Sequence, residues 1–211
     1  MERCAGNLTM TDDVQTEAVE SVESVDDGET AIDWSKAQEG VRLLLEAVGE
    51  DPESAELQET WQRRVPSAFE TLTEGSRLEE KPDLRTFEAS GNNFVVKTGI
   101  PVYSLCEHHL LPYFGTATVA YRPDGDVVGL SKLSRYVRWQ SRQLTIQEQL
   151  TQDIAHGLSD ELGAEAVLVE LSATHLCEAM RGVETQTETV TRAVAGEPTG
   201  DERQRFNEAS N

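Results

Sequence analysis

The chain has 211 residues and carries 39 acidic against 18 basic side chains, a formal net charge of −21. A surface this acidic repels nucleic acid and anionic membranes, so we expect neither as a partner. No apolar run approaches the roughly 18 residues of a membrane-spanning helix, and no leader pattern is present, which together predict a cytoplasmic protein. The acidic excess is also typical of proteins adapted to high salt, where counterions screen like charges.

The first third of the chain divides into a tail and a helical segment. Residues 1–32 are rich in acidic side chains and lack aromatic ones, which predicts a disordered tail. Apolar residues at helical spacing then predict a pair of helices within 33–75. Pro66 lies inside the second of them and should break or kink it, because proline has no N–H to donate.

The remainder alternates between strand and helix patterns. Apolar and β-branched runs predict strands at 94–103, 114–121, 127–130, 166–173 and 182–194. Helical patterns cover about 131–142 and 145–162. Antiparallel strand pairs on either side of a helical pair predict an α+β domain over 76–196, with its helices on one face of the sheet. Residues 197–211 are polar, which predicts a loose C-terminal tail.

Most of the cysteines and histidines fall in two short stretches, 104–110 and 174–177. Cys106 and His109 have the spacing C-x-x-H, which brings two side chains to one point in a turn. Cys177 is the obvious third ligand, because a strand can return it beside that turn. Two thiolates and one imidazole suit Zn²⁺, and three protein ligands leave one position open for water, as in catalytic sites.

A fourth protein ligand would instead make the site structural, and two histidines are candidates. His108 is adjacent to His109, and neighbouring side chains rarely point the same way. His175 shares a strand face with Cys177, so it either binds the metal or stands beside it as a proton-transfer group.

Basic side chains gather near one predicted helix face, which is unusual in so acidic a chain. They are Lys132, Arg135, Arg138 and Arg142. They follow Ser131, at a possible helix start, and the pattern therefore fits a phosphate site to which Arg181 could add a contact. The alternative is a solvated basic face that balances the acidic surface, and charge alone does not choose between the two.

The stretch 145–148 permits two interpretations. Thr145 and Glu148 fit a capping box at the start of a helix, in which Glu148 only caps. Alternatively, Gln147 and Glu148 offer an amide and a carboxylate to a base edge, and a carboxylate suits the N1–H and 2-amino donors of guanine. The spacing of these residues is compatible with both.

Taken together, these motifs resemble the GTP cyclohydrolase I family over about residues 41–196. The matching segments are Cys106-Glu107-His108-His109, Gly129-Leu130-Ser131-Lys132 with Arg135, Gln147-Glu148, and His175-x-Cys177 with Met180-Arg181-Gly182-Val183. The chain departs from the family pattern at Trp61, where proline is usual, at Gln143, near the usual place of an arginine, and at Glu178, where methionine is frequent.

The resemblance implies the tunnelling fold, a homodecamer of two face-to-face pentameric rings, and zinc-dependent hydrolysis of GTP to 7,8-dihydroneopterin triphosphate and formate. It implies that Cys106, His109 and Cys177 are the zinc ligands. His108 and His175 match proton-transfer residues. By the same resemblance, Ser131 assists the later rearrangement, and Gln147 and Glu148 recognise guanine. Contacts to the triphosphate are implied for Lys132, Arg135, Arg181 and Arg64. Arg64 lies where the alignment is altered around Trp61.

Two alternatives to this function stay open on sequence alone. One is another tunnelling-fold enzyme for a purine- or pterin-like substrate, although pyruvoyl-tetrahydropterin synthases bind zinc through three histidines and nitrile-reducing relatives use a nucleophilic cysteine. The other is a non-enzymatic module that zinc stabilises as an oligomer.

Overall fold

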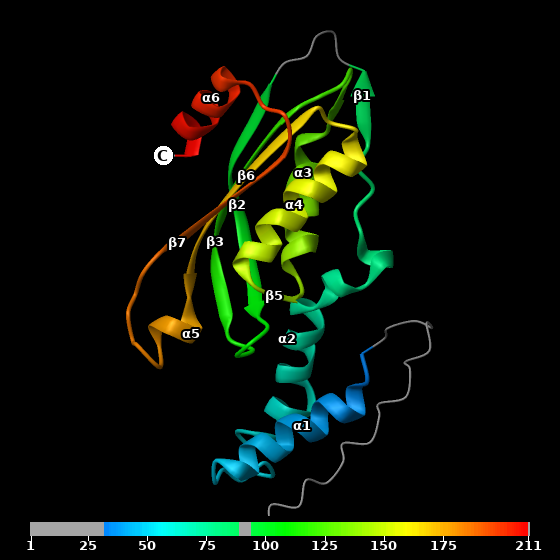
Figure 1. The fold of residues 1–211 in the computed structure, drawn as a ribbon. Helices are drawn as coiled ribbons and strands as arrows, with labels where there is room; N and C mark the ends of the chain where they lie inside the picture. The colour runs from blue at the N-terminus through cyan, green and yellow to red at the C-terminus, as the bar shows by residue number, and fades with distance from the viewer. Residues whose placement is uncertain (1–31, 89–93, 211) are drawn as a thin grey trace, which may run out of the picture. The chain divides into compact units, whose positions relative to one another are not determined.

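A five-stranded sheet forms the centre of the computed structural model, which describes residues 32–88 and 94–210 (Figure 1). The strand order is β5-β2-β3-β6-β7, with β2, β3, β6 and β7 antiparallel and the short β5 parallel to the end of β2. The strands are β2 (Val95–Cys106), β3 (Pro112–Arg122), β5 (Leu144–Thr145), β6 (Ala166–His175) and β7 (Thr189–Gly196). Residues 1–31 of the predicted acidic tail, Cys4 among them, lie outside the described residues.

Two helices, α3 (Leu130–Ser141) and α4 (Gln147–Leu162), cover one face of this sheet (Figure 1). The helix predicted over 145–162 buries an apolar stripe, in which Leu150, Ile154 and Leu158 are fully enclosed. They pack against strand residues such as Val119 and Val169. Burying each such side chain contributes about 1.5–3 kcal/mol, so this interface holds the mixed α+β fold together.

Several predicted strand boundaries change in the structure, and the strand predicted over 127–130 is shortened to Asp126–Val128 because Leu130 already begins α3. The strand predicted over 94–103 begins one residue later and runs on to Cys106 as one long strand, β2, with an irregularity between Lys97 and Ile100, where Gly99 has a φ of +66°. The strand predicted over 182–194 begins only at Thr189. A second, two-stranded sheet was not predicted: β1 (Thr86–Glu88) pairs with β4 (Asp126–Val128).

The prediction of a loose tail over 197–211 was wrong, because residues Gly200–Ser210 form helix α6 on the other face of the sheet. Phe206 is 2% exposed and packs with Phe94, Ala120 and Leu168. Arg122 also bonds both carboxylate oxygens of Glu202, at 2.9 and 2.8 Å. One buried ring in an otherwise polar segment leaves no stripe that a helical pattern would reveal.

The charge on Glu202 makes the stability of the α6 contact with the sheet depend on pH. Burial acts to raise the pKa of Glu202, but the Thr199 backbone N–H and the Arg122 guanidinium outweigh it and hold the pKa below its ordinary value. The ionised form is therefore favoured in the folded protein. Its stabilising contribution is present above the ordinary glutamate pKa and is lost as the pH falls through the lowered value.

We expect Phe206→Ala to lower the free energy of unfolding by about 3 kcal/mol, because it empties a buried ring site that helix α6 cannot refill. Urea unfolding followed by tryptophan fluorescence measures the change. Gln204→Ala, an exposed position on the same helix, is the matched control and should change stability by less than about 0.5 kcal/mol. Equal effects of the two substitutions would mean that α6 does not stay docked on the sheet.

The N-terminal helical segment contains α1 (Trp34–Ala47) and α2 (Val65–Leu72), the latter preceded by a π-helical turn over Thr60–Arg64. Asp33 caps α1 by accepting from the Lys36 backbone N–H. Pro66 cannot donate to the Gln62 carbonyl one turn earlier. The Gln38 side chain on α1 donates to that carbonyl instead, at 2.8 Å. The carbonyl that proline leaves without its helical partner thus forms a hydrogen bond with the other helix.

The described residues contain no helix that is both long and apolar enough to cross a membrane.

Candidate metal and substrate site

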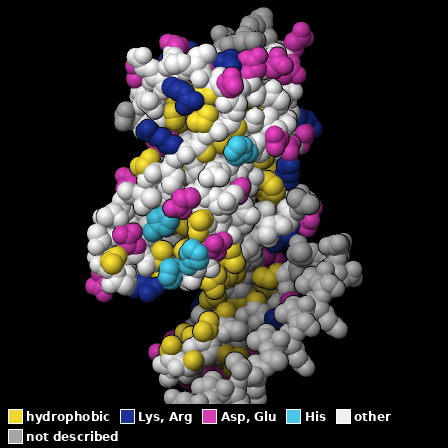
Figure 2. Space-filling model, in the orientation of Figure 1, with side chains coloured by type: hydrophobic (Ala, Val, Ile, Leu, Met, Phe, Trp, Pro, Cys, Tyr) yellow, Lys and Arg dark blue, Asp and Glu magenta, His cyan; other side chains and the backbone are white. Residues whose placement is uncertain are grey.

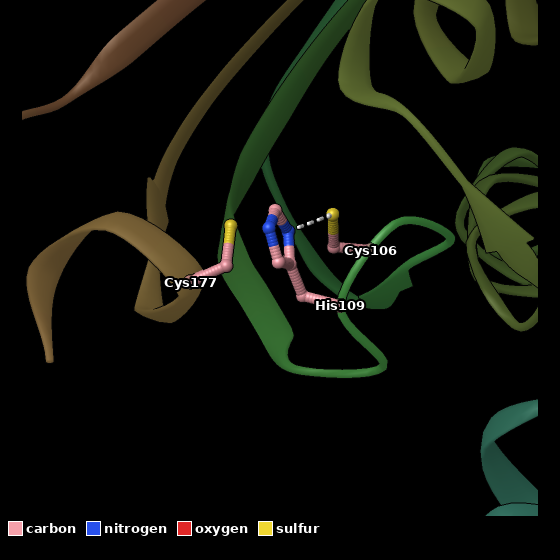
Figure 3. A group of neighbouring side chains, drawn as sticks. All are labelled: Cys106, His109 and Cys177. Carbon is pink, nitrogen blue, oxygen red and sulfur yellow. Dashed lines mark hydrogen bonds between the residues drawn. The ribbon is translucent and has the colours of Figure 1, made fainter. Parts of the chain in front are cut away.

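Cys106, His109 and Cys177 converge as the spacing predicted. Cys106 ends β2, His109 lies in the following turn, and Cys177 lies in α5 (Leu176–Ala179), directly after β6. Their sulfur and nitrogen atoms all lie within 4.8 Å of one another, and Figure 3 shows the His109 ring between the two sulfur atoms. Such a group can bind one metal ion.

The turn after Cys106 explains how the C-x-x-H spacing works. The Cys106 carbonyl accepts from the backbone N–H groups of His109 and Leu110, and its own N–H donates to the Leu111 carbonyl at 2.9 Å. Leu110 has a φ of 54°, in the left-handed region, which costs a non-glycine residue about 1–2 kcal/mol. The pairing of β2 with β3 on either side holds this strained turn in place and so fixes the direction of the His109 side chain.

The β3–β6 pairing brings the third ligand to this turn. Its last pair sets Tyr113 opposite His175, so the chain enters α5 beside the start of β3. Burial, and then the nearby Cys106 sulfur, raise the pKa of Cys177. The Cys177 thiol is therefore hard to ionise beside Cys106 without a cation between them, and a bound metal ion removes that penalty.

A cavity of about 290 Å³ opens beside the three ligands. Its walls are formed by Cys106, His108, His109, Tyr113, Thr145, Ile146, Gln147, Glu148, His175 and Cys177. Figure 2 shows histidine side chains gathered among acidic and apolar ones on this face of the protein. The cavity therefore unites both sequence stretches that hold the scarce cysteines and histidines.

His175 is held beside the metal group without belonging to it. Its ring stacks on Tyr113, with centroids 4.7 Å apart and planes 13° from parallel. Its Nε2 lies 2.7 Å from the Gln147 amide oxygen. Burial lowers the pKa of His175, while the charges of Glu148 and Glu178 act in the opposite direction. The ring is thus a neutral imidazole near pH 7, which can accept a proton.

His108 differs from His175 in its surroundings. Its side chain is 64% exposed, and its Nε2 lies 3.4 Å from a carboxylate oxygen of Glu107. It meets the His109 ring edge to face, at a centroid separation of 6.2 Å. The two histidines predicted for proton transfer therefore differ in their contacts: His108 is exposed to solvent, while His175 is held by Tyr113 and Gln147.

Of the two interpretations left open for residues 145–148, the structure does not support the capping box of Thr145 and Glu148. Thr145 belongs to β5, where it pairs with Cys106, and its hydroxyl donates to the Ile146 carbonyl. Ile146 is the N-cap of α4 and has no side-chain cap to offer. Glu148 is exposed and lines the cavity, and within the described part of the chain its carboxylate makes no hydrogen bond or ion pair.

Gln147 also lines the cavity, but its side chain is directed inward and is 1% exposed. The amide nitrogen donates to two backbone carbonyls and one hydroxyl, and the amide oxygen meets His175. The expectation that this amide faces a base edge therefore needs correction, since all its polar atoms are engaged inside the protein.

The basic residues predicted to contact phosphate lie elsewhere. None of Ser131, Lys132, Arg135, Arg181 and Arg64 lines the cavity. Arg135 lines two other hollows together with Arg138, which pairs with Glu74 at 2.7 Å. A single copy of the chain thus brings the metal ligands, histidines and Glu148 together but not the cationic groups.

Tyr113 is the residue that the sequence did not single out. Burial raises the pKa of its phenol, which therefore stays protonated and serves as a flat wall for the His175 ring. In the sequence Tyr113 lies directly before the strand predicted over 114–121, and its position becomes informative once the pairing of β3 with β6 is known.

Comparison with known proteins assigns a family. The sequence model described as GTP cyclohydrolase I matches residues 37–210. The protein named GTP cyclohydrolase 1 from Hyperthermus butylicus is 50% identical over 166 residues, 79% of this chain and 84% of that protein. Proteins of the same name from Campylobacter lari and Chlorobium phaeovibrioides are 47% and 45% identical, over 71% and 75% of this chain and 79% and 72% of theirs. The chain that carries this Cys-His-Cys group and its adjoining cavity therefore belongs to the GTP cyclohydrolase I family.

Proposed function

We propose that the chain is a zinc-dependent GTP cyclohydrolase that acts in the cytoplasm and converts GTP to 7,8-dihydroneopterin triphosphate and formate, the first step towards pterins. Membership of the family supports the reaction. The observation that carries the assignment of residues is the convergence of Cys106, His109 and Cys177 beside a neutral, held His175.

The donor set fits zinc. Zinc bonds to sulfur at about 2.3 Å and to imidazole nitrogen at about 2.0–2.1 Å, so two such ligands on a tetrahedral ion lie roughly 3.6 Å apart. The separation of Cys106 Sγ and His109 Nδ1 is 3.6 Å. Three protein ligands leave a coordination position free, and zinc, when bound, supplies Lewis-acid activation of water for hydrolysis of the five-membered ring of guanine.

The protein's own residues orient the base for that attack. The exposed Glu148 carboxylate can accept from both N1–H and the 2-amino group of guanine. The start of α4 lacks a side-chain cap, so its first backbone N–H groups are free to donate to the guanine carbonyl oxygen. These contacts would turn the five-membered ring towards the metal group and His175.

The two histidines would then move protons at different stages. His175 is neutral and fixed, which suits a group that accepts a proton from the attacking water. His108 is exposed beside Glu107 and is suited to protonate the leaving nitrogen and to exchange its proton with solvent.

A second copy of the chain would complete the site. We propose the tunnelling fold and a homodecamer, in which a neighbouring subunit brings Lys132, Arg135 and Arg181 to the triphosphate, Arg64 adds a contact, and Ser131 assists the rearrangement of the ribose. The absence of these residues from the chain's own cavity supports this arrangement. Exposed apolar side chains support association as well, namely Tyr103, Phe114, Met180, Val183 and Val190. Residues 76–196 would form the catalytic domain, and 33–75 would add the helical pair.

Incubation of the zinc-loaded protein with GTP is expected to release formate and a pterin that becomes fluorescent on oxidation, in equal amounts. Several KCl concentrations should be compared, because the net charge of −21 predicts better activity when salt screens it. Removal of zinc with a chelator should stop both products, and added zinc should restore them. Intact GTP under all these conditions would contradict the enzyme and favour a non-catalytic zinc-stabilised module.

A further inference from the structure

We propose that Gln147 is a positioning residue that fixes which ring nitrogen of His175 carries the proton, so that His175 exchanges protons with the cavity only through Nδ1. The inference rests on the proposed function for its catalytic consequence. The arrangement itself is a property of the folded chain and can be tested without turnover.

The first step is the orientation of the Gln147 amide. One end of this amide faces the backbone carbonyl oxygens of Leu171 and Thr189, each at 2.9 Å, and the Thr191 hydroxyl at 3.1 Å. Carbonyl oxygens only accept hydrogen bonds, so the atom that faces two of them must be the NH₂ group. The other end, which faces His175, is therefore the amide oxygen.

The orientation of the Gln147 amide then determines which nitrogen of His175 bears a hydrogen. An amide oxygen only accepts, and it lies 2.7 Å from His175 Nε2, so this nitrogen must bear a hydrogen. In a neutral imidazole the other nitrogen is then unprotonated. The lone pair of His175 is thus assigned to Nδ1. Across residues 32–88 and 94–210, no hydrogen bond occupies that atom.

The surroundings keep the amide from turning over. Gln147 is 1% exposed, and rotation by half a turn would set its oxygen against both backbone carbonyls. The Thr151 hydroxyl donates to the Gln147 carbonyl at 2.6 Å and also meets the Thr191 hydroxyl at 2.6 Å. Strands β6 and β7 and helix α4 therefore hold one buried network in one polarity, since reversing a single member leaves buried groups unpaired.

The histidine ring is fixed in its own plane by a separate contact. Tyr113 stacks on one face of the ring, with centroids 4.7 Å apart, and this contact favours the ring orientation in which Nε2 meets Gln147. Because His175 lines the cavity while Nε2 is engaged with a buried side chain, Nδ1 is the nitrogen available for exchange with a bound molecule. The Gln147 side chain thus acts on the reaction through His175 and not through the purine.

Nitrogen NMR reads the tautomer directly. The chain has only four histidines, so protein labelled with ¹⁵N-histidine gives few ring signals, and solid-state spectra avoid any limit set by oligomer size. His175→Asn identifies the signals of interest. We expect His175 in the zinc-loaded protein to show a protonated Nε2 and an unprotonated Nδ1. The opposite tautomer would overturn the proposal, as would an unchanged spectrum in Gln147→Met.

Kinetics separate positioning from substrate binding. Gln147→Met keeps the size of the side chain but removes the acceptor, and we expect kcat to fall about 10- to 100-fold with zinc content unchanged. The KM for GTP should move by less than roughly three-fold. Gln149→Met, the same change at an exposed position of α4 outside the cavity, is the matched control and should leave kcat unchanged.

Each remaining outcome decides something. A raised KM with unchanged kcat would overturn the proposal in favour of a contact between the amide and the base. An equal loss in Gln149→Met would show that substitution in α4, not the acceptor, matters, and would also overturn it. If the unaltered protein made no pterin, the proposed function would fail, while the NMR result would still decide the tautomer.

Discussion

Replacing Cys177 by serine is expected to remove zinc and the hydrolysis of GTP together. The three ligand atoms lie within 4.8 Å of one another, and the described residues offer no fourth cysteine or histidine within that group. Loss of one thiolate leaves two ligands, too few for a catalytic zinc site. We expect zinc content to fall from about one ion per chain to near zero and formate production to fall by about 1000-fold or more.

Atomic absorption measures the metal, and formate release measures turnover. Cys4→Ser is the matched control, because Cys4 is the remaining cysteine of the sequence and lies far from the motif along the chain. It should leave both values unchanged. Full zinc occupancy in Cys177→Ser would contradict the assignment of the metal group, whatever happened to the activity.

The second large effect is expected from Glu148→Gln. The carboxylate is exposed at the cavity and unpaired within the described chain, so it is free to accept two hydrogen bonds from the guanine edge. An amide would present a donor to one of guanine's donors. Sites built around such polar complementarity lose about 10⁴-fold in discrimination when a partner is removed, and we expect kcat/KM for GTP to fall by about 1000-fold or more.

Comparison of GTP with inosine triphosphate, which lacks the 2-amino group, shows whether the loss arises from base recognition. The unaltered protein should prefer GTP strongly, and Glu148→Gln should lose most of that preference. Asp160→Asn removes one negative charge from an exposed position on the same helix and should change neither value. A Glu148→Gln protein that kept its kcat/KM for GTP would show that guanine is recognised elsewhere.

The sequence predicted the metal group because its signal is local and chemical. Cys106 and His109 meet through a turn of four residues, and Cys177 is one of very few other thiols in the chain. The pairing of α3 and α4 over one sheet face followed from helical and strand periodicities that the core residues keep. These are properties that a single chain carries in its own pattern.

The remaining features depend on long-range pairing that spacing does not reveal. Thr145 fitted a capping box until its pairing with Cys106 drew it into a strand. One interpretation of the sequence turns the Gln147 amide towards a base edge, but the carbonyl oxygens of Leu171 in β6 and Thr189 in β7 accept hydrogen bonds from it inside the protein. Helix α6 is stabilised because Phe206 packs into an apolar site formed by distant strands. The polar sequence of the helix itself gives no sign of this contact.

The unbroken ladder between β3 and β6 sets the contacts that anchor helix α6 far from the candidate catalytic site. Its ten consecutive pairs run from Arg122 and Ala166 at one end to Tyr113 and His175 at the other, which is roughly 30 Å of continuous strand. Helix α6 is anchored near the first end and the histidine stands at the second. Changes that adapt the acidic exterior around α6 to temperature or salt can therefore accumulate while the spacing of catalytic groups stays constant.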